Sequence, residues 1–390
     1  MSEIGVGLVG YRFMGRVHSN AYRQVARFFD VDPVPRMRAI CGRNEEAVSA
    51  AANALGWEDY ETDYARMLER DDVGLVDISS SSGDTHHEYA LAALEAGKHV
   101  LCEKPLANKL SEARDLVEAA EKSGTVSMVC HNYWRVPAVQ LAKKLIDEGR
   151  LGEIRHWRAV YLQDWLLDPE TPMSWRLRKE TGGAGPLADL GSHLVDLAHF
   201  LVGPIAEVIG TAESFIKERP REGTGGKEGE MDRVTVNDAA AFLARFENGA
   251  IGTFEASPLV PGRKAKESFE INGSEGSIVF DLERMNELQV HFVDETPEAS
   301  GFRTVLVTEP EHPYAGAWWP PGHIIGYEHT FVHTVKDLLD GIKTGVGPGP
   351  TFEDGYRCQA VLDAVERSLE NREWTSPEIE RTKGRVYGEV

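Results

Sequence analysis

Five apolar runs of strand length alternate with helical segments along residues 1–131, and this alternation constrains the fold more than any other feature. The runs are IGVGLV, RMRAIC, LVDIS, KHVLC and TVSMVC, and two of the helical segments between them end at Gly97 and Gly124. Strands that alternate with helices form βαβ units, which predicts an α/β fold with a parallel sheet. The carboxyl ends of such strands share one edge of the sheet, where ligands bind.

A glycine-rich turn, GLVGYRFMG, follows the first of these runs. Gly10, Arg12 and Gly15 occupy the positions of the dinucleotide-binding pattern G-x-G-x-x-G, with an arginine where the middle glycine lets the backbone approach a pyrophosphate. The alternative is an ordinary strand-to-helix turn that binds nothing. The strand–helix context favours a dinucleotide-binding domain over residues 1–131. We expect Gly10, Arg12, Phe13 and Met14 to contact the cofactor.

The end of the second strand carries Gly42 and Arg43 instead of an acidic residue. An acidic side chain at this place usually binds the ribose 2′-hydroxyl of NAD. Arg43 could bind the 2′-phosphate of NADP, or its guanidinium could stack on the adenine. It could also be a solvated residue at a helix start. These residues lean slightly towards NADP, and they leave the choice between the two cofactors open.

Composition excludes several classes of partner. The 390 residues carry a formal net charge of −21, which disfavours nucleic acid and anionic membrane surfaces and favours a neutral substrate. We find no secretory signal and no apolar run of bilayer length. The four cysteines form no C-x-x-C pair and are typical of buried thiols in a reducing cytoplasm, where we expect the chain to reside. They are Cys41, Cys102, Cys130 and Cys358.

Residues 132–390 have a different pattern, and we expect them to form a second α/β domain. Strand-like runs joined by turns occupy about 205–308, including a hairpin at Asn248-Gly249, and helical patterns follow near 326–342 and 353–371. The pattern predicts a large, open, mostly antiparallel sheet with helices. A wide open sheet must cover its second face, so we expect a homo-oligomer, a dimer or tetramer, built through this sheet.

Two short segments have residues suited to acid–base chemistry. In CEKPLA, Glu103 can pair with Lys104, and a lysine in a cleft can donate a hydrogen bond to a substrate hydroxyl. The alternative is a surface salt bridge. In ADLGSHLVD, Asp189 and His193 are four residues apart and share one face if the segment is a helix. Asp189 could then orient His193 as a general base. Alternatively, Asp189 caps the helix and His193 is an interior histidine.

Aromatic and polar residues gather in several loop-like stretches of the second domain. Indole faces suit the C–H faces of sugar rings, and neighbouring polar groups could bind hydroxyls, although packing is the alternative for many tryptophans. His329 and His333 have a spacing found in metal sites, but no third ligand pattern accompanies them, so we expect no metal. The expected substrate-binding residues are Lys104, Tyr133, Gln163, Trp165, Trp175, Arg176, Asp189, His193 and His329.

Together, GLVGYRFMG, GKHVLCEKPLA and GGAGPLADLGSHLVD resemble the Gfo/Idh/MocA oxidoreductases over nearly the whole chain. The resemblance implies an N-terminal Rossmann domain, a C-terminal domain with an open sheet, and a nicotinamide cofactor. It also implies that Lys104, Asp189 and His193 are catalytic, with His193 as the acid/base. Arg12 departs from the family pattern, as does Ser81-Ser82, which stands where the family often has Thr-Pro. The remaining cofactor-binding residues that we expect are Ser79, Ser81, His86, Glu103 and Lys104.

The segments NYWRVPAVQLAK and YLQDWLLDPETPMSWR are most similar to the subgroup of levoglucosan and scyllo-inositol dehydrogenases. That likeness implies NAD as cofactor, with NADP not excluded, and oxidation of a ring hydroxyl of a neutral sugar or cyclic polyol to a ketone. We expect levoglucosan, oxidised to 3-keto-levoglucosan, as the substrate, and scyllo- or myo-inositol as the next candidates. A non-catalytic regulator that senses a dinucleotide and an NAD-dependent glycosidase are the alternatives from other classes.

Overall fold

The computed structural model describes residues 2–80, 83–222 and 230–380, and the chain divides into two compact units. Unit 1 consists of the residues up to Cys130, Val335–Ala360 and the segment from Glu378. Unit 2 consists of His131–Thr334 and Val361–Pro377. The first boundary lies one residue from the expected one.

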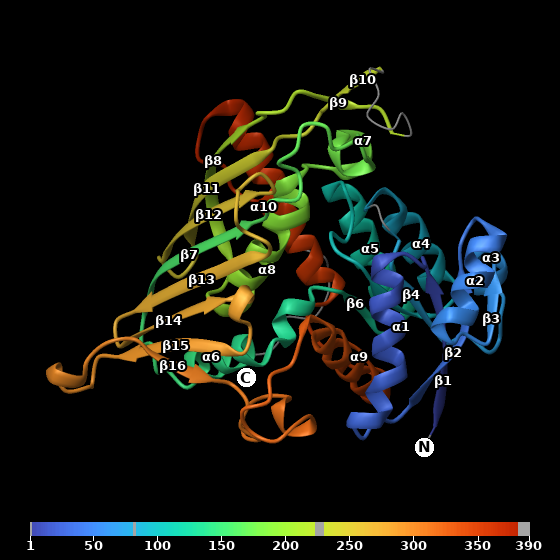
Figure 1. Ribbon diagram of the computed structural model, residues 1–390, viewed down its shortest axis with the longest axis horizontal. Helices are drawn as coiled ribbons and strands as arrows, with labels where there is room; N and C mark the ends of the chain where they lie inside the picture. Colours follow the sequence, from blue (N-terminus) through green and yellow to red (C-terminus); the bar gives the residue numbers. More distant parts are fainter. Residues whose placement is uncertain (1, 81–82, 223–229, 381–390) are drawn as a thin grey trace. The chain divides into compact units, whose positions relative to one another are not determined.

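Unit 1 contains a six-stranded sheet in which every neighbouring pair is parallel, in the order β3-β2-β1-β4-β5-β6 (Figure 1). The order reverses between β1 and β4, which is the switch point where open α/β sheets bind ligands. The five predicted strands are present, and the three-residue strand β3 is too short to produce a recognisable pattern. The strands are β1 (Glu3–Val9), β2 (Val34–Cys41), β3 (Asp59–Glu61), β4 (Leu75–Ile78), β5 (His99–Cys102) and β6 (Ser127–Val129).

Helices connect these strands and end where the sequence indicates. Gly56 and Gly124 adopt left-handed backbone conformations directly after their helices, which glycine does without steric cost. The helices are α1 (Phe13–Phe28), α2 (Glu45–Leu55), α3 (Tyr64–Leu68), α4 (Gly83–Glu95) and α5 (Leu110–Ser123).

The C-terminal helices α9 (Tyr327–Thr344) and α10 (Phe352–Asn371) contribute residues to both units. Phe352 and Tyr356 are almost fully buried in the hydrophobic core of unit 1. The grouping therefore differs from the expected assignment of both helices to the second domain. Burial of these aromatic side chains in the core beside β6 accounts for the difference.

Unit 2 contains an eight-stranded mixed sheet in the order β16-β15-β14-β13-β7-β12-β11-β8. Only the β7–β12 pair is parallel, so the predicted mostly antiparallel sheet is confirmed. The predicted Asn248-Gly249 turn joins β11 to β12. The strands are β7 (Ile154–Leu162), β8 (Ile205–Glu213), β11 (Ala239–Phe246), β12 (Ile251–Ser257), β13 (Lys266–Gly273), β14 (Gly276–Asp281), β15 (Glu287–Phe292) and β16 (Arg303–Leu306), and a separate pair consists of β9 (Glu218–Pro220) and β10 (Met231–Arg233).

Helices cover one face of this sheet, and the opposite face has none over it (Figure 1). Between sheet and helices, Trp157 is 1% exposed and stacks on Phe269, with ring centroids 5.2 Å apart. On the uncovered face, Leu243 and Ile251 are 49% and 54% exposed. The helices of unit 2 are α6 (Pro137–Asp147), α7 (Lys179–Gly182), α8 (Ser192–Leu201) and the end of α10, with short 3₁₀ turns η1 (Asn132–Arg135), η2 (Trp175–Leu177), η4 (Leu282–Arg284), η5 (Pro297–Ala299) and η6 (Ala315–Ala317).

Substitution of the buried Trp157 tests whether this tryptophan stabilises the core of unit 2. We expect Trp157→Ala to lower the free energy of unfolding by about 3–5 kcal/mol, because it leaves a cavity beside Phe269. Trp319, which is 47% exposed, is the control, and Trp319→Ala should cost less than about 1 kcal/mol. Urea unfolding followed by far-UV circular dichroism measures both, and equal losses would contradict the assignment.

Candidate active site

The glycine turn after β1 leads directly into the N-terminus of α1. Gly10 has φ +101°, and a Cβ there would lie 2.8 Å from the carbonyl oxygen of Ser79. A Cβ on Gly15 would lie 2.2 Å from the carbonyl oxygen of Gly10. Only glycine fits at these two positions. The first turn of α1 has no acidic residue and no side-chain cap, so its backbone N–H groups suit an anion. This cradle fits the pyrophosphate of a dinucleotide.

Arg12, the residue in place of the middle glycine, is the N-cap of α1 and is exposed. Its φ of −79° is negative, so this position does not require the left-handed backbone conformation that favours glycine. Phe13 begins the helix and is 65% exposed, and Met14 is half-buried behind it. The three residues therefore line the same helix end as the cradle, as the dinucleotide prediction requires.

The end of β2 lies at the same edge of the sheet. The N–H of Gly42 donates to the carbonyl oxygen of Glu61, and a Cβ on Gly42 would lie 2.2 Å from the ring of Tyr11. Gly42 thus makes room for an aromatic side chain of the glycine turn. Arg43 is exposed beside it, and the Asn44 side chain accepts from the amide of Ala47 to cap α2.

The ends of β4 and β5 bring Ser79, His86 and Lys104 to this edge as well. The Ser79 hydroxyl donates to the carbonyl oxygen of Val9, 2.9 Å away. His86 is buried, with its Nδ1 atom 2.7 Å from the carbonyl oxygen of Pro105, and burial lowers its pKa. Lys104 is half-buried and precedes Pro105 through a cis peptide bond. Ser81, also expected here, lies outside the described residues.

Glu103 is placed differently from the surface salt bridge considered above. Its side chain is 5% exposed, and its Oε1 atom lies 2.9 Å from Nε2 of His18, while Oε2 accepts from the Lys104 amide at 3.2 Å. The carboxylate therefore binds the backbone of Lys104 and a histidine of α1. The sequence did not indicate this partner, because a contact between residues 85 positions apart has no local signal.

In unit 2, the residues around Asp189 adopt a π-helical turn, η3 (Leu187–Gly191), before α8 begins at Ser192. The expectation of one regular α-helix through Asp189 and His193 is therefore wrong. Neither helix has Asp189 as its N-cap, which removes the capping alternative. Single π turns occur frequently at functional sites because they change the direction of side chains. The buried Leu190, Leu194, Leu197 and Leu201 still form the apolar side of this segment.

The His193 ring is 6% exposed and lies against aromatic side chains. Its centroid is 4.7 Å from that of Tyr133 and 5.8 Å from that of Tyr161, and the two tyrosine hydroxyls are 3.1 Å apart. Burial raises the pKa of both tyrosines above the usual value. The two hydroxyls are neutral at physiological pH, as ordinary tyrosines are, and neutral hydroxyls suit hydrogen bonding to an uncharged polyol.

Asp189 forms an ion pair with a residue predicted for the substrate. Its Oδ2 atom lies 3.6 Å from Nε of Arg176, whose guanidinium is 4.3 Å from the centre of the Trp175 ring. Gln163 accepts a hydrogen bond from the indole of Trp165, which is 44% exposed. The predicted substrate residues in these contacts thus form two groups. One contains Trp175, Arg176 and Asp189, and the other contains Gln163 and Trp165, directly after β7.

His329 and His333 both contact Trp318. The edge of the His329 ring meets the indole at 4.4 Å, and Nε2 of His333 accepts from the indole N–H at 2.7 Å. Nδ1 of His333 lies 2.8 Å from the carbonyl oxygen of Arg135. Both nitrogens of His333 thus lie at hydrogen-bond distance from protein groups.

Sequence reasoning missed several buried polar residues. Tyr161 and Glu267 are opposite each other in the β7–β13 pair, and His131 lies 5.5 Å from His193 by ring centroid and 3.8 Å from Asp196. Glu267 is fully buried. The alternation of β13 could have identified Glu267, because it occupies the same face as the apolar Phe269 and Ile271. No local pattern marks His131.

Comparison with known protein families finds a match for both parts of the chain. Residues 4–131 match the model described as an oxidoreductase family with an NAD-binding Rossmann fold, and residues 139–279 match the GFO/IDH/MocA C-terminal domain. The chain belongs to the GFO/IDH/MocA oxidoreductase family. Its N-terminal region is accordingly an NAD-binding Rossmann domain, and the predicted fold and family are confirmed.

Among the family members, the chain is 40% identical to levoglucosan dehydrogenase from Pseudarthrobacter phenanthrenivorans, over 97% of this chain and all of that protein. A structure of levoglucosan dehydrogenase with NADH and levoglucosan has 39% identity and a TM-score of 0.92, covering 96% of this chain and 100% of the other. An oxidoreductase domain protein from Kribbella flavida is 52% identical, with a TM-score of 0.93, over 97% and 100% of the two chains. This GFO/IDH/MocA protein is thus an NAD-dependent oxidoreductase close to levoglucosan dehydrogenase.

None of the helices in residues 2–80, 83–222 and 230–380 has the length and hydropathy needed to cross a bilayer. The cysteines are buried and none of the four forms a disulfide, as their spacing indicates.

The glycine cradle can be tested by comparing two glycines with positive φ. Gly10→Ala should weaken NADH binding at least about tenfold, because its Cβ pushes Ser79 away from the turn. Gly97, with φ +70° and open space around it, is the matched control. Gly97→Ala should cost about 1–2 kcal/mol of stability and leave the affinity unchanged. Fluorescence titration with NADH measures the affinities, and the same affinity in both variants would contradict the cradle.

Proposed function

We propose that this chain oxidises a secondary ring hydroxyl of a neutral sugar or cyclic polyol to a ketone, with levoglucosan as substrate and NAD as cofactor. The observation that carries the proposal is the identity of 40% to levoglucosan dehydrogenase over 97% of this chain and all of that protein. The neutral tyrosine pair beside His193 supports it, because it offers uncharged hydroxyls to a polyol. Inositol is the second candidate, on the same chemistry.

Each catalytic residue has a proposed role. His193 takes the proton of the reacting hydroxyl, and the Asp189 carboxylate stabilises the positive charge that the imidazole gains. Lys104 donates a hydrogen bond to the same hydroxyl and lowers its pKa by its charge. The chemistry that bound NAD supplies is acceptance of the hydride. Tyr133, Gln163 and the tryptophans after β7 bind the ring of the substrate, and Arg176 pairs with the Asp189 carboxylate.

Residues of unit 1 have proposed roles in binding the cofactor. The N–H groups at the start of α1, together with Gly10 and Arg12, would hold the pyrophosphate, and Arg43 would stack on the adenine side. The backbone of Arg12 faces the phosphates in this proposal. We also propose that the protein works in the cytoplasm.

A substrate panel tests the reaction. We expect the purified protein to form NADH with NAD and levoglucosan, and Lys104→Ala to lower kcat at least about 100-fold, because a group that acts on the reacting proton is lost. Lys109→Ala, which removes an exposed lysine five residues away, should change kcat less than about twofold. Absorbance at 340 nm follows the reaction with anhydrosugars, aldoses and inositols.

Other outcomes of the panel distinguish the alternatives. Reduction with NADP alone would overturn the cofactor assignment, and reduction with inositols alone would overturn levoglucosan. Bound cofactor without hydride transfer to any polyol would indicate a regulator. Release of an aglycone from a glycoside without net NADH would indicate a glycosidase. Near-normal turnover in Lys104→Ala would contradict the role of that lysine.

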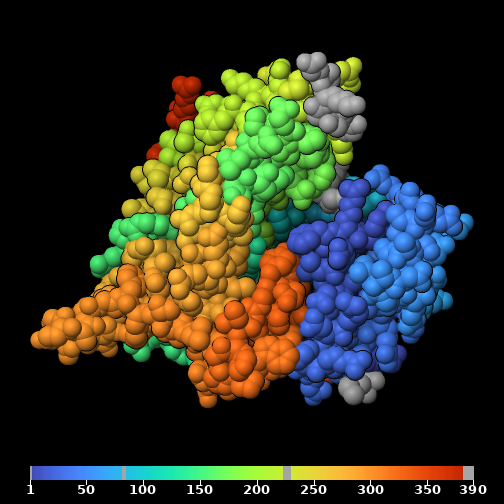
Figure 2. All heavy atoms as spheres, viewed as in Figure 1, coloured from blue at the N-terminus to red at the C-terminus, as the bar shows by residue number. Residues whose placement is uncertain are grey.

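The uncovered face of the unit 2 sheet supports a homo-oligomer. Leu243 and Ile251 are about half exposed on it, beside the half-buried Ile209 and Val160. The connection between β15 and β16 projects from the sheet (orange, lower left in Figure 2) and carries the exposed Val293 and Phe302. A second copy would remove these side chains from water.

The oligomer can be tested by charging this face. We expect the native protein to sediment as a dimer or tetramer, and Leu243→Glu combined with Ile251→Glu to shift it to monomer, because burying two carboxylates opposes association. Val346→Glu, a change at an exposed valine of unit 1, is the control. Analytical ultracentrifugation measures the masses, and an unchanged mass in the double variant would exclude this face as the interface.

A further inference from the structure

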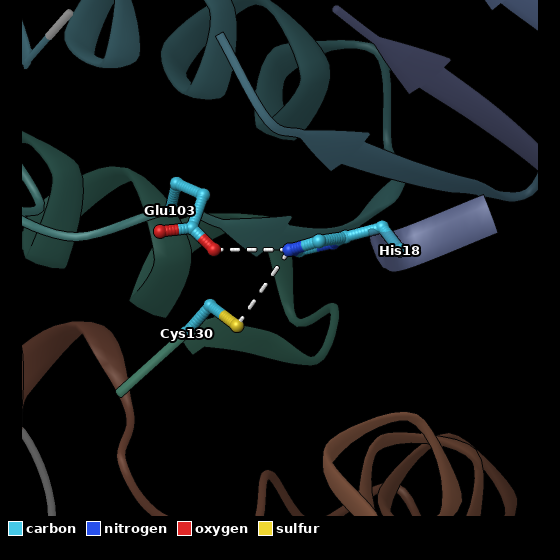
Figure 3. Close-up of side chains that lie close together, drawn as sticks. All are labelled: His18, Glu103 and Cys130. Atoms are coloured by element: carbon cyan, nitrogen blue, oxygen red, sulfur yellow. Dashed lines mark hydrogen bonds and ion pairs between the residues drawn. The ribbon is translucent and has the colours of Figure 1, made fainter. Parts of the chain in front are cut away.

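Unit 1 contains a buried charged cluster in which Glu103, a predicted cofactor-binding residue, contacts His18, a residue outside the predicted site. His18 lies in the second turn of α1 and is 1% exposed, and its Nδ1 atom is 2.8 Å from a carboxylate oxygen of Asp77 in β4. Its Nε2 atom is 2.9 Å from Oε1 of Glu103, and the sulfur of Cys130 is 3.9 Å away (Figure 3). Tyr22 adds a hydrogen bond to Asp77 at 2.8 Å.

The geometry requires a charged histidine ring. A neutral imidazole has one N–H donor, whereas both ring nitrogens of His18 face carboxylate oxygens. Only the imidazolium donates to both. Burial opposes this charge, but the charge and hydrogen bond of Asp77 together with Cys130 raise the pKa of His18 well above its usual value. For Glu103, burial raises the pKa, but the hydrogen bond and charge of His18 together with the charges of Lys104 and His86 lower it below the usual value.

Glu103 connects His18 to the backbone of Lys104. Glu103 uses one oxygen for the imidazolium and the other for the amide N–H of Lys104. The Glu103 amide itself donates to the carbonyl oxygen of Ile78 at 2.8 Å. On the far side of Lys104, the carbonyl oxygen of Pro105 is bound by His86. A buried histidine therefore fixes the residue on each side of Lys104.

Metal binding is the competing explanation for this cluster. The donor atoms of His18, Glu103 and Cys130 all lie within 4.8 Å of one another. However, each ring nitrogen of His18 already has a carboxylate oxygen at hydrogen-bond distance, and an imidazolium has no lone pair for a metal. The hydrogen bonds account for the arrangement without an ion.

We propose that His18 is a positioning residue for Lys104, which it orients through Glu103. The proposal rests on the catalytic role assigned above to Lys104. The imidazolium holds Glu103 ionised and in one orientation, and Glu103 in turn holds the backbone from which the lysine side chain extends. Small displacements of a catalytic group cost much activity, because the reaction depends on orientation.

The expected result for His18→Gln is a kcat about 100-fold lower, with the KM for the sugar and the dissociation constant for NADH changed less than about threefold. Glutamine carries no positive charge, and its N–H donors lie on one nitrogen, whereas His18 faces the two carboxylates with two separate ring nitrogens. Tyr22→Phe is the matched control, because it removes a hydrogen bond to Asp77 and touches no atom of Glu103. Its kcat should stay within about twofold of the native value.

A second comparison separates positioning from general damage. In a Lys104→Ala background, His18→Gln should lower the remaining kcat less than about twofold, because the group that it positions is absent. A similar drop in both backgrounds would overturn the proposal, as would near-native kcat in a folded His18→Gln variant. Should His18→Gln fail to fold, Glu103→Gln replaces it in the same comparison. Native turnover in Lys104→Ala alone would instead contradict the proposed function.

Discussion

The cofactor-binding part of the predicted site depends on the parallel pairing of the unit 1 strands. Parallel neighbours cannot be joined by a tight turn, so each connection passes through a helix and returns to the same edge. The carboxyl ends of β1, β2, β4 and β5 consequently meet at one edge, with the reversal of strand order between β1 and β4. Gly10, Gly42 and Ser79 each follow one of these strands directly, Lys104 is the second residue after β5, and a one-element change in topology would separate them.

Electrostatics at this edge serve two different purposes. The exposed start of α1 lacks acidic residues and has no side-chain cap, and its backbone N–H groups favour an anionic ligand. Beneath it, Asp77 and Glu103 are buried carboxylates that only a charged His18 can satisfy together. Breaking one member of such a buried set is costly, because an uncompensated charge remains. The cluster thus restricts the backbone next to Lys104 to one arrangement.

Unit 2 supplies a different environment. His193 is enclosed by the rings of Tyr133 and Tyr161, which offer neutral hydroxyls, and Asp189 pairs with Arg176. Asp189 lies in the π turn directly before α8. The wider winding of a π turn gives its side chains directions that a regular α-helix does not give. A neutral, aromatic surface with a few charged groups suits a ring that offers hydroxyls on its edge and C–H bonds on its face.

Much of this protein follows from local patterns in its sequence. Strand–helix alternation, glycines at helix ends and the Asn248-Gly249 hairpin determined the α/β class, the parallel sheet and the mostly antiparallel second sheet, because such signals act over a few residues. Tertiary structure alone decided the partner of Glu103, the π turn at Asp189, the tyrosine pair at His193 and the core position of Phe352 and Tyr356. These depend on contacts between distant residues, whose energies no local periodicity records. The role of a buried polar side chain is set by the neighbours that packing brings to it.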